Sequence, residues 1–262
     1  MIKKWLTFSI QSHLFLAIST FVFSMGVLGQ NQHALVFSFA LSSAVLGVYN
    51  LNRLNKLKKE ELPSEFLFWY KENQFLLSFL ATFCLLISAL LYVNLLREDI
   101  ATLLLLVAIG IITILYIFSR KQLNIRQIPG TKSLWVSLVW TCISVVIPKM
   151  TLGSFERNDL LYSILFFALT IPGDLRDSAF DSPRMKTIPQ LIGNRTAELV
   201  FYGFIAVFLL LNYFMNPLSL IGIILVFIYI LSLNRSSFRY ELMDGLLLVL
   251  GFIYLFGKDI IP

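Results

Sequence analysis

Charged residues are scarce in this chain. Of its 262 residues, 14% are charged and 58% are apolar, and the mean hydropathy is +0.80. Soluble domains are about 45–50% apolar and about 25% charged. So few charges do not cover the surface of a water-soluble globule this apolar, which excludes a soluble fold. The composition instead predicts a polytopic membrane protein built from α-helices.

Cysteine is also nearly absent. The two cysteines, Cys84 and Cys142, both lie inside apolar runs. This placement excludes a disulfide framework and a cysteine-based metal site. The net charge of +6 does not predict a nucleic-acid partner, because the basic residues of a membrane protein mainly indicate which of its loops are cytoplasmic.

The N-terminal segment resembles a signal peptide in having two lysines before an apolar stretch. However, Gln11, Ser12 and His13 interrupt the stretch, and no small-x-small cleavage site follows. We therefore expect this segment to be retained as the first of several spans.

Apolar runs between polar breaks predict about nine transmembrane helices in one domain that covers residues 1–262. The predicted spans are 13–29, 34–51, 75–96, 99–118, 134–151, 159–173, 197–215, 217–233 and 241–257.

The basic residues predict the orientation of these spans. With a cytoplasmic N-terminus, 17 of the 21 Lys and Arg residues fall on cytoplasmic segments, and the other side keeps Arg97, Lys149, Arg157 and Lys258. This asymmetry follows the positive-inside rule. We expect a multi-pass protein of the bacterial inner membrane, with its longest polar connections on the cytoplasmic side.

Acidic residues number only 15, yet three of them lie at Asp174, Asp177 and Asp181, after the sixth predicted span. On a helix, offsets of 0, 3 and 7 residues place the three carboxylates on one stripe about 60° wide. Such carboxylates repel each other unless a cation or raised pKa values relieve them. Carboxylate oxygens suit Mg²⁺ that also binds substrate phosphates. The alternative is a solvated helix end in which Arg176 is the counterion.

Basic residues follow these acids. Arg184 and Lys186 lie within reach of phosphate oxygens bound at that face, although the positive-inside rule alone also explains them.

The segment after the second predicted span contains Asn52, Asn55 and Lys59, which repeat the 0, 3, 7 spacing. Amides ligate hard cations or bind phosphate but supply no negative charge. In a third polar segment, Arg126 and Lys132 are placed to cap an anionic headgroup, and Trp135 and Trp140 to line an apolar cavity. Both pairs also fit ordinary contacts with the lipid interface.

These motifs together resemble the UbiA superfamily of intramembrane prenyltransferases. The resemblance covers essentially the whole chain. It rests on the string Asp174-Leu-Arg-Asp177-Ser-Ala-Phe-Asp181, on the stretch Lys186-Thr-Ile-Pro-Gln-Leu-Ile-Gly193, and on polar motifs after the second and sixth spans. The first motif departs from the family pattern. Tyr49, Asn52 and Arg53 resemble a variant that begins Tyr-x-x-Asp-Arg, and Asn52 and Asn55 stand where the family has acids.

The resemblance implies a helical bundle around a cavity open to the membrane. It implies that Mg²⁺ and an isoprenyl diphosphate bind at the inner mouth, and that the prenyl chain is transferred to an aromatic or lipid-like acceptor. The implied metal ligands and catalytic residues are Asp174, Asp177 and Asp181. The implied substrate-binding residues are Tyr49, Asn52, Arg53, Asn55, Lys59, Arg126, Lys132 and Lys186.

The departure limits what this site can do. With Asn52, Asn55 and Lys59 in place of acids, up to three negative charges are missing from one half of the site, which leaves activity uncertain. Our hypothesis is that one Mg²⁺ on the Asp174 motif suffices. The alternative is a non-catalytic membrane binder or small-solute transporter, although a transporter predicts polar groups at the bilayer midplane. A CDP-alcohol phosphotransferase is excluded because its Asp-Gly-x-x-Ala-Arg opening is missing.

Overall fold

The computed structural model describes residues 2–58, 64–118, 131–177, 187–215, 220–233 and 239–256. These residues form helices and no strand, as predicted from the composition. The elements are α1 (Ile2–Gln11), α2 (Leu14–Leu28), α3 (Gln32–Lys58), α4 (Ser64–Glu72), α5 (Gln74–Leu96), α6 (Ile100–Phe118), α7 (Thr131–Thr141), the π-helix η2 (Cys142–Val146), α8 (Ile147–Thr151), the 3-10 helix η3 (Arg157–Leu161), α9 (Tyr162–Asp177), α10 (Ile188–Ile192), α11 (Asn194–Met215), α12 (Leu220–Leu233), α13 (Arg239–Leu242) and α14 (Gly245–Phe256).

Several of these helices are suited to a membrane. Four are long and apolar enough to cross one: α3, α5, α11 and the continuous helical segment Thr131–Thr151. The bent pair of α1 and α2 makes a fifth if the two count as one span. The described chain therefore has membrane-protein character. The number of spans and the side of the N-terminus stay predictions.

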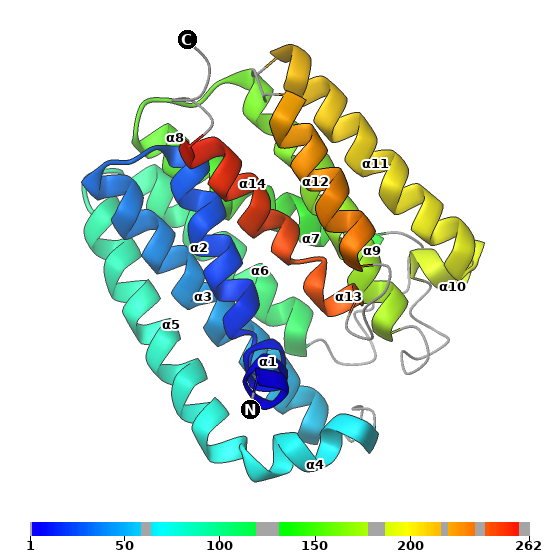
Figure 1. The fold of residues 1–262 in the computed structure, drawn as a ribbon. Coiled ribbons are helices and arrows are strands. Elements are labelled where there is room, and N and C mark those ends of the chain that lie inside the picture. The colour runs from blue at the N-terminus through cyan, green and yellow to red at the C-terminus, as the bar shows by residue number, and fades with distance from the viewer. Residues whose placement is uncertain are drawn as a thin grey trace.

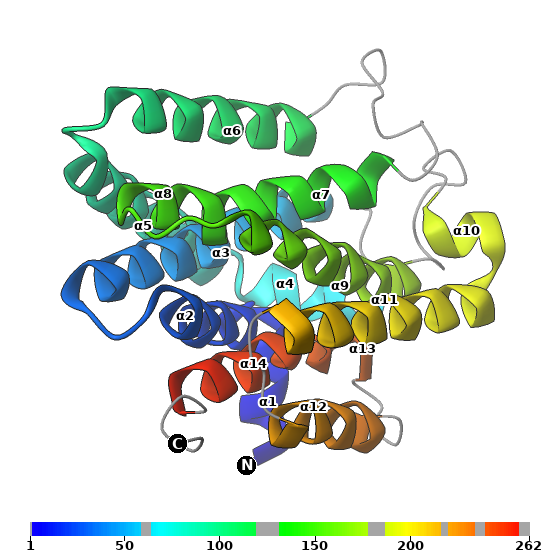
Figure 2. The ribbon, with the colours of Figure 1, turned by 90° about the horizontal axis from the view of Figure 1, so that it is seen from above.

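The helices pack side by side as a bundle (Figures 1 and 2). Helix α2 packs against both α3 and α14, and α9 packs against both α7 and α11. The rings of Phe23 and Phe166 join the two groups, with centroids 5.7 Å apart in an edge-to-face arrangement. Both side chains are buried, so the core of the bundle lies between α2 and α9.

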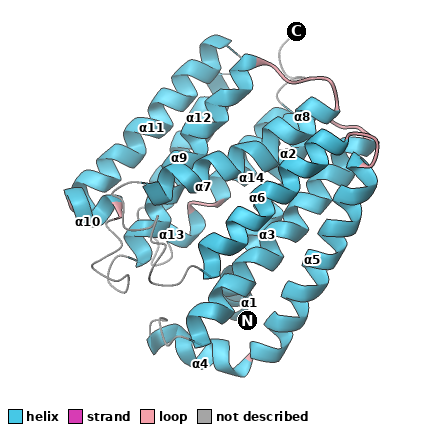
Figure 3. Ribbon diagram, turned by 180° about the vertical axis from the view of Figure 1, so that it is seen from behind, coloured by secondary structure: helices cyan, strands magenta, loops and turns pink. Residues whose placement is uncertain are grey.

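The outside of the bundle is apolar. Helices α5, α6, α11 and α12 expose large side chains such as Phe79, Leu104, Phe214 and Leu231. These helices lie at the periphery of the bundle, as Figure 2 shows for α6 and α12 and Figure 3 for α5 and α11. Exposed apolar surface on this scale is unfavourable in water and favourable against lipid.

One end of the bundle is closed by a buried ion pair. Lys149 Nζ, at the end of α8, lies 2.6 Å from Asp159 Oδ1, and only 4% of the Asp159 side chain is exposed. The other oxygen, Oδ2, accepts a hydrogen bond from the Glu156 backbone N–H at 2.7 Å. Both oxygens of Asp159 thus hold the α8–η3 connection together, which is a structural role.

Candidate functional site

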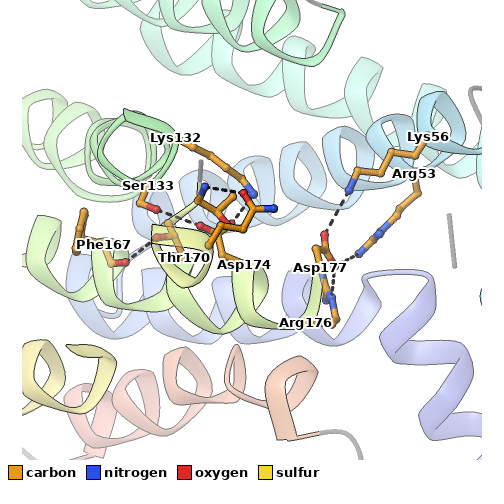
Figure 4. Close-up of polar contacts among 11 residues, drawn as sticks. Arg53, Lys56, Lys132, Ser133, Phe167, Thr170, Asp174, Arg176 and Asp177 are labelled. Atoms are coloured by element: carbon orange, nitrogen blue, oxygen red, sulfur yellow. Dashed lines mark hydrogen bonds and ion pairs between the residues drawn. The ribbon is translucent and has the colours of Figure 1, made fainter. Parts of the chain in front are cut away.

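Polar side chains gather at the opposite end of the bundle, where α3 and α9 finish and α7 begins. Helix α9 contributes Asp174 and Asp177, α7 contributes Lys132 and Ser133, and α3 contributes cations (Figure 4). Six of these residues form what we call the ionic cluster: Arg53, Lys56, Lys132, Asp174, Arg176 and Asp177.

Asp174 faces α7. Its Oδ1 forms an ion pair with Lys132 Nζ, and its Oδ2 accepts a hydrogen bond from Ser133 Oγ at 3.3 Å. Only 2% of the Asp174 side chain is exposed, against 25% for Lys132. A carboxylate this buried needs a counterion to stay charged, and Lys132 supplies it.

Asp177 faces α3 and its own neighbour. Arg176 Nε lies 2.7 Å and an Arg53 guanidinium nitrogen 4.0 Å from Oδ1, while Lys56 Nζ lies 3.3 Å from Oδ2. Burial alone would raise the pKa of Asp177, but the charges of Arg176, Arg53 and Lys56 outweigh it and hold the pKa well below its usual value. Asp177 therefore stays ionised throughout the neutral range, and its ion pairs weaken only as the pH falls toward that lowered pKa.

The ionic cluster is a positive site. Its ion pairs bring two carboxylates together with four cations, namely Lys132, Arg53, Lys56 and Arg176. The surplus of positive charge attracts an anion. Arginine and lysine together suit phosphate, because the guanidinium binds two oxygens at once and the ammonium adds a flexible charge.

The same carboxylates have the right chemistry for Mg²⁺, which binds one or two carboxylates and completes its shell with water and phosphate oxygens. In the protein alone, each oxygen of Asp174 faces a donor. Within the described ranges, no three His, Cys, Asp or Glu side chains form a metal-binding group. Asp174 and Asp177 are thus paired with cations and hydrogen-bond donors in this structure, and the magnesium site stays a prediction.

The predicted site residues fall into two groups. Asp181, Lys59, Arg126 and Lys186 lie outside the described residues. Arg53 and Lys132 lie in the ionic cluster, next to the predicted Asp174 and Asp177.

The remaining predicted residues lie on α3. Asn55 lines a groove of about 280 Å³ between α3 and α5. Asn52 is half-buried. Tyr49 is directed into the bundle, with its ring centroid 5.2 Å from that of His13 and 6.3 Å from that of Trp140. Tyr49 thus lies toward the core, whereas Asn55 lies beside α5.

Two functional candidates were not predicted as site residues. Lys56 lies one turn after Arg53, and this spacing in the sequence indicated a shared helix face. Ser133 immediately follows Lys132, and only the packing of α7 on α9 identifies it as a partner of Asp174.

The Lys132–Asp174 pair gives a prediction about stability. Lys132→Met leaves Asp174 buried without its counterion, and we expect a loss of about 3–5 kcal/mol in unfolding free energy. Adding Asp174→Asn removes the stranded charge, so the double variant should recover much of that loss. Thermal or denaturant unfolding in detergent measures both variants against the exposed control Lys71→Met. Equal stability of the Lys132→Met single and double variants would contradict the pairing.

Comparisons with protein-family models, curated proteins and solved structures found no match to this chain. The assignment of function therefore depends on the residues and their geometry.

Proposed function

We propose that this protein is an intramembrane prenyltransferase that transfers an isoprenyl chain from a polyprenyl diphosphate to an aromatic or lipid-like acceptor. The observation that carries the proposal is the ionic cluster. It presents four cations and two buried or half-buried carboxylates at one end of a helical bundle with an apolar exterior. A substrate with a diphosphate head and an apolar tail matches this combination of surfaces.

The proposal includes nine spans with the N-terminus in the cytoplasm and the ionic cluster at the cytoplasmic face. The distribution of basic residues supports this orientation. The shorter apolar helices Ile100–Ile114, Leu220–Leu233 and Gly245–Phe256 would be the additional spans, together with the helix ending at Asp177.

The residues of the ionic cluster have distinct roles in the proposal. Arg53, Lys56 and Lys132 bind and orient the diphosphate oxygens through charge-assisted hydrogen bonds. Asp174 and Asp177 would hold Mg²⁺, with Asp181 as a further ligand. When bound, Mg²⁺ neutralises negative charge on the departing diphosphate.

The apolar interior contributes to the reaction by excluding water from the reactive carbon. The rings of Tyr49, Trp140 and Phe166 form a row that leads toward the core, and the Trp140 and Phe166 centroids are 5.4 Å apart. Aromatic faces stabilise positive charge that develops on the prenyl chain as the carbon–oxygen bond to diphosphate breaks.

Turnover is the direct test. Membranes containing the protein are incubated with radiolabelled prenyl diphosphates of several chain lengths and a lipid extract of the source cells. We expect labelled lipid products with Mg²⁺ and a loss of product of at least about tenfold with EDTA, because the departing diphosphate is then not neutralised. Membranes without the protein provide the blank. Tight substrate binding without any product would favour a non-catalytic binder, a function that the missing acids at Asn52 and Asn55 also suit.

A further inference from the structure

Helices α1 and α2 meet at a sharp break. Their axes are bent by 73°. His13, at the break, has φ 57°, a left-handed conformation that non-glycine residues rarely adopt. The break interrupts a long apolar segment with Gln11, Ser12 and His13, all of which are polar.

Polar atoms at this break are buried without partners. Within the described part of the chain, no protein group hydrogen-bonds to Gln11 Oε1, Ser12 Oγ, His13 Nε2 or Asn50 Oδ1. Ser12 is 1% exposed, His13 8% and Asn50 0%. Buried polar groups are satisfied in native proteins by protein, water or ligand, so four such atoms at one place need water or a ligand as their partner.

Neighbouring helices hold the break in shape. Asn50 Nδ2, on α3, donates to the backbone carbonyls of Ser12 and Leu46, each at 2.8 Å. Tyr70, on α4, donates from its hydroxyl to the Gln11 carbonyl at 2.8 Å. These bonds satisfy the backbone and fix the Asn50 amide, so its Oδ1 is left as an acceptor.

The unpartnered atoms define the chemistry of the ligand. Gln11 Oε1 and Asn50 Oδ1 accept hydrogen bonds only, whereas Ser12 Oγ donates or accepts. An anion supplies acceptors only and would leave the two amide oxygens unsatisfied. A neutral ligand with a hydroxyl group supplies the donor that they need.

The break lies next to the ionic cluster. Asn50 is one helical turn before Arg53 on α3, and the charges of Arg53, Arg176 and Asp177 act on His13. The His13 ring also lies against Tyr49, the first of the rings that continue through Trp140 into the core.

We propose that the α1–α2 break binds the hydroxyl group of a neutral, hydroxyl-bearing acceptor such as a phenol or lipid alcohol. Gln11, Ser12, His13 and Asn50 are the hydrogen-bonding residues of this site. The role as acceptor site rests on the proposed prenyltransferase function, whereas the preference for a hydroxyl group rests on the unpartnered atoms alone.

The test compares two ligands that differ in one hydrogen-bond donor. The full-length protein in nanodiscs is titrated with 4-(trifluoromethyl)phenol and with its methyl ether, 4-(trifluoromethyl)anisole, and binding is followed by fluorine NMR against empty nanodiscs. We expect the phenol to bind about tenfold more tightly than the ether, because only the phenol donates a hydrogen bond to the buried acceptors.

Two variants test whether the preference for phenol over its methyl ether arises at the α1–α2 break. Ser12→Ala removes a hydroxyl group that hydrogen-bonds to no described protein group, and His13→Asn keeps a residue that tolerates positive φ. Each should reduce the preference for phenol at least about threefold. The matched control is Ser19→Ala, which removes another buried, unpartnered hydroxyl of α2 away from the break and should keep the full preference.

Equal binding of phenol and ether to the wild-type protein would overturn the inference. It would mean that water alone satisfies the buried polar atoms at the break. An unchanged preference in both variants, or an equal loss in Ser19→Ala, would also overturn it. The titrations contain no prenyl diphosphate. A preference for phenol without turnover would therefore reject only the prenyltransferase proposal. Turnover without a preference for phenol would reject only the acceptor site.

Discussion

Replacing Asp174 and Asp177 together by Asn is expected to lower the Mg²⁺-dependent affinity for a polyprenyl diphosphate by at least about 100-fold. Mg²⁺ binds proteins through one or two carboxylates, and this variant removes both of those at the site that the structure describes. The amide retains a similar shape and one acceptor oxygen, so the hydrogen bond from Ser133 to Asp174 has a counterpart in the variant. Binding is measured with purified protein in detergent, with Mg²⁺ and with EDTA.

The control for this experiment is the double variant Glu72→Gln and Glu98→Gln. It changes the net charge by the same amount at two exposed positions. Its affinity should remain close to that of the wild type. If the Asp174 and Asp177 variant keeps its Mg²⁺-dependent affinity, these two carboxylates do not hold the metal, and the single-magnesium hypothesis is rejected.

The helical segments could be predicted because each depends on local composition. Each predicted span overlaps a helical segment of the described residues, and α5 (Gln74–Leu96) differs from the prediction 75–96 by one residue. The number of membrane crossings stays a prediction. Long apolar runs in lipid form helices irrespective of their neighbours, since a helix satisfies its backbone hydrogen bonds within one segment.

Polar segments were less predictable. Helix α4 (Ser64–Glu72) lies within a stretch that we expected to be a connection. Its Tyr70 belongs to a buried apolar cluster with Leu54 and Leu57 of α3 and Leu77 of α5. The break at His13 likewise depends on Asn50 of α3, so the sequence of α1 and α2 alone did not indicate its angle.

The site was predictable in part, for the same reason. Helical spacing predicted that Asp174 and Asp177 lie about 60° apart on one stripe. At the surface of α9 this difference is enough to direct them to different neighbours, Asp174 to α7 and Asp177 to α3. Periodicity defines directions around one helix, but the partners depend on how the helices pack.

The first motif shows the same limit. Asn52, Asn55 and Lys59 were predicted to share a face by analogy with the acidic spacing. The residues of α3 that contact Asp177 are Arg53 and Lys56, shifted by one position along the helix. One position rotates a side chain by about 100°, so Arg53 and Lys56 lie on a different face of α3 from Asn52 and Asn55. The result is a face that supplies positive charge instead of metal ligands.

This positive face leads to the second large effect. Replacing Arg53 and Lys56 together by Gln is expected to weaken the binding of farnesyl diphosphate by at least about 100-fold. Each lost charge-assisted hydrogen bond weakens binding by about 1.5–3 kcal/mol, and 1.4 kcal/mol is a factor of ten. The fold should persist because Arg176 still lies 2.7 Å from Asp177 and keeps that carboxylate paired. Equilibrium binding in detergent, with unfolding monitored in parallel, measures both effects.

The control must separate contact from overall charge. Lys71→Gln with Arg195→Gln removes the same two positive charges from exposed positions on the predicted cytoplasmic side. A loss of long-range attraction weakens diphosphate binding by both double variants. This effect is screened by salt, since the Debye length is about 8 Å at physiological ionic strength. Direct contact weakens only the Arg53 and Lys56 variant, and that loss should persist at high salt. Equal losses in the two variants would mean that α3 attracts the diphosphate without binding it, and the anion site would then have to be formed by Lys132 and Arg176.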